Sequence, residues 1–386
     1  MQKTILNIIL PTLFLITFAV CTQAKILIPA PPNLAATAWI LIDANTGKVL
    51  IESNADLQLP PASLTKIMTS YIVAKDIENG RVSADDKVPV SVKAWKMGGS
   101  RMFIQEGTKV SLSDLLEGVI VSSGNDASVA LAEYIAGSES AFADIMNQQA
   151  SLMGMTGTYY SNSTGWPDDD HVTTARDLAF LSRALINEYP LQYSIYANKY
   201  FKFNGIDQTN RNSLLWRDSS VDGLKTGHTE EAGYCLVASA SRKGMRLISV
   251  VMGAKSKASR AQESQKLLAY GFRYYETNKI HSAGDVVKEG STVWYGVVDK
   301  INLITPKDIY VTIPQGSKEE LKSNIILSSA IEAPITETQE LGRMSVALDD
   351  EILIDFPIFA ENDVDEAGVL ERLWDSLQMM FNGMME

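Results

Sequence analysis

The chain has 386 residues, of which 46% are hydrophobic and 21% are charged, and its formal net charge at pH 7 is −12. This composition is ordinary for a globular protein with at least one sizeable core, and it excludes a largely disordered chain. The acidic balance also excludes nucleic acid as a partner, because a nucleic-acid binder must neutralise phosphates with a basic surface.

Residues 1–24 have the layout of a secretory signal peptide. Lys3 supplies a short positive region, residues 5–20 are mostly apolar, and small or polar residues follow up to Ala24. We therefore expect export with cleavage near Ala24; an uncleaved membrane anchor is the alternative. Cleavage would leave Cys235 as the single cysteine of the mature protein, so no internal disulfide is expected.

The segment after the signal predicts a β-hairpin followed by a helix. Residues 38–52 contain two apolar runs that flank an Asn-Thr-Gly-Lys turn, which is a typical hairpin pattern. After two consecutive prolines, residues 63–79 follow a helical pattern that Gly80 ends.

Helices and strands then alternate up to about residue 275. A helix with a break at 122–125 is expected within 111–136, and Thr174 is expected to cap another helix that runs to residue 187. Two strands are expected over 234–240 and 245–251, followed by a helix over 259–275. We therefore predict a single α/β domain over residues 25–278, with helices bracketing a central sheet.

The pattern changes near residue 279. Short β-rich runs are separated by Gly, Pro, Asn and Asp, and they cover 293–298, 309–313, 343–348 and 351–356. These runs predict a small all-β domain over residues 279–362.

Residues 363–386 predict an amphipathic C-terminal helix. Its apolar side chains recur at three-residue and four-residue steps: Val369, Leu370, Leu373, Trp374, Leu377, Met380, Phe381 and Met384. We expect this stripe to bind the outer face of the cytoplasmic membrane by hydrophobic contact; a helix packed on the protein's own core is the alternative. Residues 367–386 carry three acidic side chains and one arginine, so attraction to anionic lipid cannot be the main contribution to membrane binding.

Ser63-Leu64-Thr65-Lys66 is the only S-x-x-K tetrapeptide in the chain. Residues three apart on a helix share a face, so the Ser63 hydroxyl and the Lys66 amine can hydrogen-bond. A serine needs an adjacent base to act as a nucleophile, and lysine can serve as that base when burial or a nearby cation lowers its pKa. The tetrapeptide alone is a weak signal.

Two further short motifs follow in the sequence. Residues 123–125, Ser-Gly-Asn, offer a hydroxyl and a carboxamide at the expected helix break; a loop with capping residues is the alternative. Residues 225–227, Lys-Thr-Gly, could bind an anion at a strand edge, because glycine lets a ligand approach the backbone; a surface turn is the alternative.

The ordered trio S-x-x-K, S-x-N and K-T-G is the signature set of penicillin-binding proteins and class A β-lactamases. More closely, the chain resembles the low-molecular-mass penicillin-binding proteins of the D-alanyl-D-alanine carboxypeptidase type. The resemblance lies in residues 61–66, 123–126, 221–229, 236–240 and 245–248. It covers nearly all of the mature chain and implies a catalytic domain with helices around an antiparallel sheet, followed by the small β domain and the terminal helix.

The resemblance also implies roles for the residues of the first two motifs. Ser63 would attack the carbonyl of the penultimate D-alanine of a peptidoglycan stem pentapeptide, and Lys66 would accept its proton. Ser123 would relay a proton to the departing D-alanine. Asn125 would hold the substrate amide. Water would then hydrolyse the acyl-enzyme.

The terminal carboxylate of the substrate would lie against the third motif. Lys225, Thr226, Gly227 and, by spacing, Arg260 would receive it. The backbone N–H groups of the nucleophile and of His228 would form the oxyanion hole, where negative charge develops in the transition state. The His228 side chain is expected to be structural, because a lysine already serves as the base.

The resemblance implies β-lactam antibiotics as covalent inhibitors and a place on the periplasmic side of the inner membrane. No cofactor is expected, and the three histidines and one mature cysteine show no zinc-ligand spacing. Two other functions are weighed. A class A β-lactamase is disfavoured because residues 126–224 lack its E-x-x-L-N pattern, although they contain Glu188 and the acidic run 168–170. A non-catalytic peptidoglycan-binding protein would not need the nucleophile pair.

Overall fold

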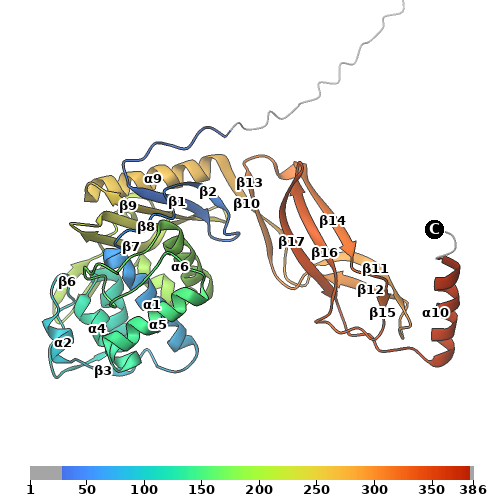
Figure 1. The fold of residues 1–386 in the computed structure, drawn as a ribbon, viewed down its shortest axis with the longest axis horizontal. Coiled ribbons are helices and arrows are strands. Elements are labelled where there is room, and N and C mark those ends of the chain that lie inside the picture. Colours follow the sequence, from blue (N-terminus) through green and yellow to red (C-terminus); the bar gives the residue numbers. More distant parts are fainter. Residues whose placement is uncertain (1–27, 383–386) are drawn as a thin grey trace, which may run out of the picture.

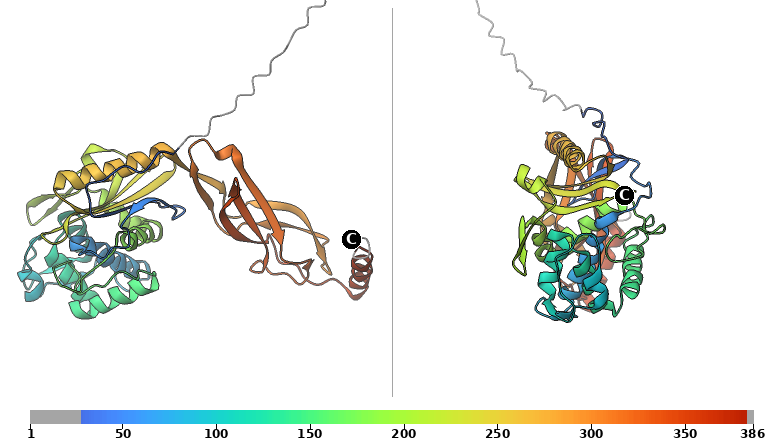
Figure 2. Two further views of the ribbon diagram at one scale, coloured as in Figure 1. Left: turned by 45° about the horizontal axis from the view of Figure 1, so that its top comes forward. Right: turned by 90° about the vertical axis from the view of Figure 1, so that its left-hand side faces the viewer.

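The structure is a computed structural model that describes residues 28–382. The predicted signal peptide lies outside these residues. Figure 1 shows an elongated molecule in which a mixed helical and β domain is followed by a β domain, with a single helix at the far end. The left view of Figure 2 shows the same order of parts, whereas the right view looks along the length of the molecule.

A five-stranded antiparallel sheet lies at the centre of the first domain, in the order β2-β1-β9-β8-β7. The predicted hairpin is confirmed as β1–β2, and the predicted strand pair is β8–β9. The K-T-G motif lies within β7, an edge strand of the sheet, so the surface-turn alternative is wrong. The strands are β1 (Ala38–Asp43), β2 (Val49–Ser53), β7 (Val221–Thr229), β8 (Gly233–Arg242) and β9 (Met245–Ala254).

Helices cover both faces of this sheet (Figure 1). The long helix α9 (Lys257–Tyr274) packs on one face, where Leu41 and Leu247 of the sheet share a core with Leu267. On the other face, Ile40 and Val250 belong to the core that also contains the apolar side chains of α1 (Lys66–Glu78) and α6 (Ala175–Glu188). Because each strand alternates its side chains between faces, one sheet serves both cores.

The remaining elements of this domain are short helices and two small hairpins. As predicted, the helical stretch 111–136 is broken, and Thr174 caps α6 by accepting a 3.0 Å hydrogen bond from the Asp177 backbone N–H. The helical elements are η1 (Ala62–Thr65), α2 (Val92–Lys96), α3 (Leu112–Glu117), η2 (Gly118–Ser122), α4 (Asn125–Ala136), α5 (Glu139–Leu152), α7 (Pro190–Tyr193), η3 (Ser194–Ala197) and α8 (Leu214–Arg217). The hairpins are β3 (Lys87–Pro89) with β4 (Lys109–Ser111), and β5 (Tyr200–Phe203) with β6 (Ile206–Thr209).

The second domain is β-rich, as predicted. A six-stranded sheet in the order β14-β16-β17-β12-β11-β15 and the pair β10–β13 enclose a separate core. The run predicted as a strand over 293–298 is wrong in its second half, because β11 ends at Trp294 and Tyr295 takes a left-handed φ of 63°. The elements are β10 (Tyr275–His281), β11 (Val286–Trp294), β12 (Lys300–Ile304), β13 (Ile309–Pro314), η4 (Lys318–Glu320), β14 (Leu321–Leu327), β15 (Ile331–Glu332), β16 (Glu340–Leu348) and β17 (Glu351–Ala360).

The terminal helix α10 (Val369–Asn382) turns its polar side towards the β domain. The Asp375 carboxylate accepts a 2.6 Å hydrogen bond from the Tyr295 backbone N–H, whereas Leu370 is 84% exposed and Trp374 is 62% exposed. Packing of the apolar stripe on the protein's own core is therefore wrong for the described part of the helix. Within residues 28–382, no helix is long and apolar enough to cross a membrane.

Candidate active site

Ser63 lies in a tight turn directly before α1. Ala62 is buried and has a left-handed φ of 48°, and its carbonyl packs against Gly165. A Cβ on Gly165 would lie 1.7 Å from the Ala62 oxygen, so any side chain at this position would displace the turn. Ser63 itself is in the one-turn helix η1, and its Oγ lies 3.1 Å from Nζ of Lys66 at the start of α1.

The Lys66 amine is fully buried and has three oxygen partners. Besides Ser63 Oγ, it donates to Oδ1 of Asn125 at 2.7 Å and to the backbone carbonyl of Thr164 at 2.6 Å. Burial, and secondarily the positive charge of Arg211, lowers the pKa of Lys66 to about 7. At neutral pH a large share of this amine is therefore unprotonated, as a general base must be.

Ser123 and Asn125 lie at the break between η2 and α4. Ser123 has a left-handed φ of 59°, and its hydroxyl accepts a 2.8 Å hydrogen bond from Nζ of Lys225. The Asn125 amide accepts from Lys66 and donates to the Gly98 carbonyl at 2.8 Å. One N–H of Asn125 is left for a ligand, since an amide has two donors.

Asp126, the next residue, fixes the loop that covers this part of the site. Its carboxylate accepts hydrogen bonds from the backbone N–H groups of Met102, Phe103 and Ile104, at 2.8–3.2 Å. The sequence alone does not reveal that Asp126 holds this loop. An aspartate in the first turn of a helix is already favoured by the helix dipole, so its presence needs no further explanation.

Strand β7 brings the third motif close to Ser63. A Cβ on Gly227 would lie 2.9 Å from the Pro61 carbonyl, so glycine permits the close approach of β7 to the turn that carries Ser63. Lys225 is buried, and burial together with the charge of Lys66 lowers its pKa well below the usual value. Lys66 and Lys225 thus lie in one site, and each contacts a different serine hydroxyl.

These elements enclose a cavity of ≈ 400 Å³. Three of the lining residues were not predicted: Ser100, Arg211 and Lys257. Lys257 lies one helical turn before Arg260 on α9, a spacing that could have revealed it, but Arg211 follows a small hairpin and belongs to no motif. No carboxylate is among the lining residues, which are Ser63, Ser100, Ser123, Arg211, Thr226, Gly227, His228, Lys257 and Arg260.

Arg260 and His228 line the cavity but are held by protein contacts. Arg260 is buried and donates to the Gly227 carbonyl at 2.9 Å, and its guanidinium lies over the Tyr234 ring. The His228 ring packs on the same tyrosine, with 4.0 Å between ring centroids. A larger cavity of ≈ 670 Å³ beside Lys75 contains none of the predicted site residues.

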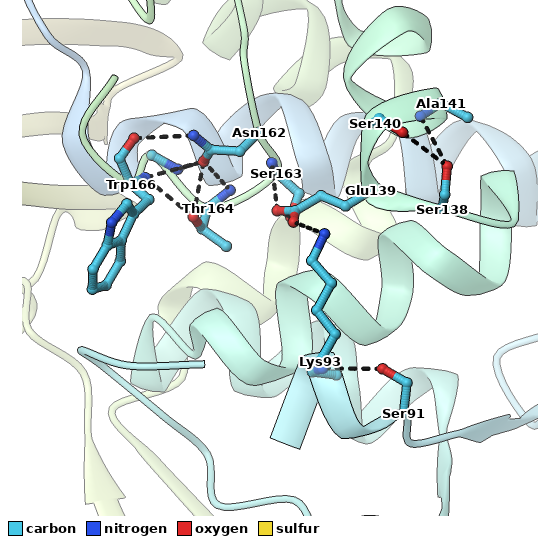
Figure 3. A network of polar contacts seen from close by, with 12 residues as sticks. Ser91, Lys93, Ser138, Glu139, Ser140, Ala141, Asn162, Ser163, Thr164 and Trp166 are labelled. Atoms are coloured by element: carbon cyan, nitrogen blue, oxygen red, sulfur yellow. Dashed lines mark hydrogen bonds and ion pairs between the residues drawn. The ribbon is translucent and has the colours of Figure 1, made fainter. Parts of the chain in front are cut away.

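A polar network supports the loop that carries the Thr164 carbonyl (Figure 3). The Glu139 carboxylate accepts from the backbone N–H and the hydroxyl of Ser163, at 3.2 and 2.8 Å, and forms a 2.8 Å ion pair with Lys93. The carbonyl of Ser163 accepts hydrogen bonds from Thr69 and Ser128. Lys93, Glu139 and Ser163 therefore connect α2, α5 and this loop.

Comparison with known proteins places the chain and its fold in one class. Residues 25–256 match the D-alanyl-D-alanine carboxypeptidase family, and residues 275–366 match the C-terminal domain of penicillin-binding protein 5. Penicillin-binding protein 5 from Haemophilus influenzae has a similar structure, with a TM-score of 0.82 and 41% identity over 88% of this chain and 100% of that chain. The fold is therefore that of the penicillin-binding proteins.

The sequence comparison is equally extensive. D-alanyl-D-alanine carboxypeptidase DacA of Escherichia coli (strain K12) is 41% identical over 367 residues, which cover 93% of this chain and 91% of DacA. Penicillin-binding protein D2 from Listeria monocytogenes, solved in an ampicillin-bound form, matches 62% of this chain and 100% of its own with 33% identity and a TM-score of 0.58. The chain belongs to the D-alanyl-D-alanine carboxypeptidase family of serine peptidases.

Proposed function

We propose that this D-alanyl-D-alanine carboxypeptidase removes the terminal D-alanine of peptidoglycan pentapeptides through an acyl-enzyme on Ser63. The observation that carries the proposal is the buried Lys66 amine, 3.1 Å from Ser63 Oγ and with a pKa of about 7. A serine hydroxyl is a weak nucleophile until a base of matched pKa takes its proton.

Acylation moves one proton twice. Lys66 takes the hydroxyl proton as Ser63 Oγ bonds to the carbonyl carbon of the penultimate D-alanine. The resulting oxyanion faces the backbone N–H groups of Ser63 and His228. As the peptide bond breaks, the proton held by Lys66 is relayed through the hydroxyl of Ser123, which accepts from Lys225, to the leaving amine, so Lys66 is neutral again. Water then attacks the ester while Lys66 takes a proton from it, and this proton returns to Ser63 Oγ as the shortened peptide leaves.

The charge of the cavity selects a substrate with a free C-terminus. Lys225, Thr226, Gly227 and Arg260 receive the carboxylate, and Arg211 adds a positive charge without any carboxylate lining the cavity. A buried, charge-assisted hydrogen bond to an anion is stronger than a neutral one, so an amidated peptide should bind poorly.

The same nucleophile accounts for inhibition by β-lactams. When Ser63 opens the lactam ring, the amine that is expelled stays attached to the acyl group. Unlike the D-alanine released from a peptide, it cannot diffuse away. A β-lactamase would need a deacylating carboxylate at the cavity, but Glu188 accepts from the Tyr71 hydroxyl at 2.7 Å and does not line the cavity. We infer that acylation by β-lactams is long-lived.

We also propose that the enzyme works on the periplasmic side of the inner membrane, held there by α10. The exposed apolar stripe of α10 supports this role: Val369, Leu370, Leu373 and Trp374 are each more than 60% exposed. Burying such side chains in the lipid interface stabilises binding by about 1.5–3 kcal/mol each when burial is complete.

The test of the proposed function is incubation with a synthetic pentapeptide that ends in D-alanyl-D-alanine, followed by assay of free D-alanine. The wild-type enzyme should release one D-alanine per peptide, whereas Ser63→Ala should release none and the C-terminal amide should be a poor substrate. Release of D-alanine by Ser63→Ala at the wild-type rate would exclude the proposed nucleophile.

A further inference from the structure

The Thr164 carbonyl limits the orientations that the Lys66 amine can take. An unprotonated amine has two N–H donors and one lone pair. Asn125 Oδ1 and Thr164 O can only accept, and they lie 2.7 and 2.6 Å from Lys66 Nζ. With both donors used on these oxygens, the lone pair is left for the hydroxyl of Ser63. The position of the Thr164 carbonyl therefore affects how well Lys66 can take the proton.

The side chain of Asn162 sets the conformation of the segment that carries this carbonyl (Figure 3). Its Oδ1 accepts from the backbone N–H groups of Thr164, Gly165 and Trp166 at 3.1, 2.8 and 3.0 Å, and from the Thr164 hydroxyl at 2.8 Å. Its Nδ2 donates to the Trp166 carbonyl at 3.0 Å. One side chain thus holds the peptide units on both sides of Thr164.

His171 ties the same segment to the turn of the nucleophile. Its Nδ1 accepts from the Ser161 backbone N–H at 3.1 Å, so the proton of the neutral ring is on Nε2. Nε2 lies 2.8 Å from the Thr65 hydroxyl, which in turn donates to the Ala62 carbonyl. Ser161 and Thr65 are therefore joined through one ring. Burial lowers the pKa of His171 to about 4, so the ring is neutral at neutral pH.

We propose that Asn162 is a positioning residue for acyl transfer, which holds the Thr164 carbonyl where it directs the lone pair of Lys66 to Ser63. This inference rests on the proposed role of Lys66 as the general base. Many loops use an asparagine to hold nearby backbone N–H groups. Here the residue so held, Thr164, gives its carbonyl to the catalytic amine, and this contact distinguishes Asn162 from a purely structural asparagine.

Asn147 provides a matched control. Its side chain also holds backbone of the same segment, accepting from the Tyr160 N–H at 2.7 Å and donating to the Tyr160 carbonyl at 2.8 Å. Within residues 28–382 it forms no hydrogen bond with Thr164 or Lys66. Asn147→Ala and Asn162→Ala therefore remove the same chemistry at different distances from the base.

The experiment measures kcat and KM for the pentapeptide, and the pH dependence of acylation by a labelled penicillin, in the full-length enzyme. Asn162→Ala should lower kcat by about 10²-fold with KM nearly unchanged, because a misplaced base slows the chemical step without touching the carboxylate site. The Thr164 carbonyl stabilises the ammonium form of Lys66, so its displacement should lower the pKa of Lys66. The acid limb of the pH–rate profile, where acylation slows as pH falls, should therefore move to lower pH.

Two further variants complete the test. Asn162→Ser can hold the same N–H groups more weakly and should recover part of kcat, and Asn147→Ala should keep the wild-type kcat and acid limb at temperatures where it is folded. A wild-type kcat in Asn162→Ala, an unmoved acid limb, or an equal loss in Asn147→Ala would overturn the proposal. Lys66→Ala separates the two hypotheses. If Lys66→Ala still acylates, the base assignment fails; if it is inactive while Asn162→Ala is normal, only the positioning role fails.

Discussion

Lys225 donates a 2.8 Å hydrogen bond to the hydroxyl of Ser123, a residue 102 positions earlier in the chain. Lys66 lies in the same site, with its Nζ 3.1 Å from Ser63 Oγ. Two buried lysines cannot both stay protonated at low cost, and the charge of Lys66 is one of the causes that lower the pKa of Lys225. The site is therefore built to keep a basic amine unprotonated near neutral pH.

Acylation by penicillin should depend on pH through Lys66. Its pKa is lowered to about 7, first by burial and then by the charge of Arg211. The base form is the neutral amine, so the acylation rate should rise with pH up to about 7 and fall about tenfold per pH unit below it. Arg211→Ala should move this limb to higher pH, whereas Arg217→Ala, at the end of the nearby helix α8, should not. An unmoved limb in Arg211→Ala would contradict the electrostatic argument.

Arg260 should matter for peptide binding more than for acylation by penicillin. Loss of a hydrogen bond to a charged group costs about 1.5–3 kcal/mol, so Arg260→Ala should raise KM for the pentapeptide by roughly 10- to 100-fold. Arg273→Ala, at the other end of α9, should leave KM unchanged. Steady-state release of D-alanine gives KM for both variants. A wild-type KM in Arg260→Ala would remove Arg260 from the carboxylate site.

Penicillin should modify Ser63 and remain bound far longer than the substrate acyl group. The amine expelled from the opened lactam ring stays attached to the acyl group, and among the described residues no carboxylate lines the cavity to activate a deacylating water. Intact-mass measurement with peptide mapping would identify the serine, and the return of the unmodified mass over time would give the lifetime of the adduct. A label on any other serine, or turnover of penicillin as fast as of peptide, would contradict the assignment.

His171 should make the folded protein less stable in acid. Burial lowers its pKa from 6.5 to about 4, so below pH 6.5 the unfolded chain binds a proton that the folded protein excludes. The free energy of unfolding should therefore fall between pH 6.5 and 4, by up to about 3 kcal/mol from this group. Urea unfolding at several pH values would measure the change. His171→Asn should lose that part of the pH dependence, and an unchanged slope in this variant would refute the explanation.

The C-terminal helix should hold the protein on membranes by hydrophobic contact. Detergent should release the full-length protein from a membrane fraction, and high salt should not, because the polar side of α10 is not basic. A variant that ends at Glu361 should be soluble and should still release D-alanine. Release of the intact protein by salt alone would show that charge holds the helix.

The sequence predicts the fold well where pattern and local chemistry agree. The hairpin β1–β2, the broken helix before α4 and the cap of α6 each follow from turn or capping residues. Strand β7 was not predicted, because Gly223 and Gly227 interrupt it and its lysine and threonine are polar although they lie in the interior. Its identity as a strand depends on pairing with β8, which no local pattern reveals.

The candidate site, like the fold, is predicted only in part from the sequence. The three motifs identify the residues that lie around Ser63, but they do not show how the residues are held. Arg211, Asp126 and the Thr164 carbonyl act through contacts between segments distant in the sequence. A backbone carbonyl in particular has no residue type to signal it, so only the folded chain reveals that the Thr164 carbonyl contacts the Lys66 amine.

The elongated arrangement of the parts has a consequence for access to substrate. The cavity beside Ser63 lies in the first domain. Helix α10 lies at the far end of the second domain, so the β domain separates the two (Figure 1). If α10 rests on the lipid surface, the cavity is held above the membrane at a distance set by the length of the β domain. The enzyme can then act only on stem peptides that lie at that distance from the membrane. Loss of α10 would leave the chemistry intact and enlarge the volume of cell wall that each molecule can search.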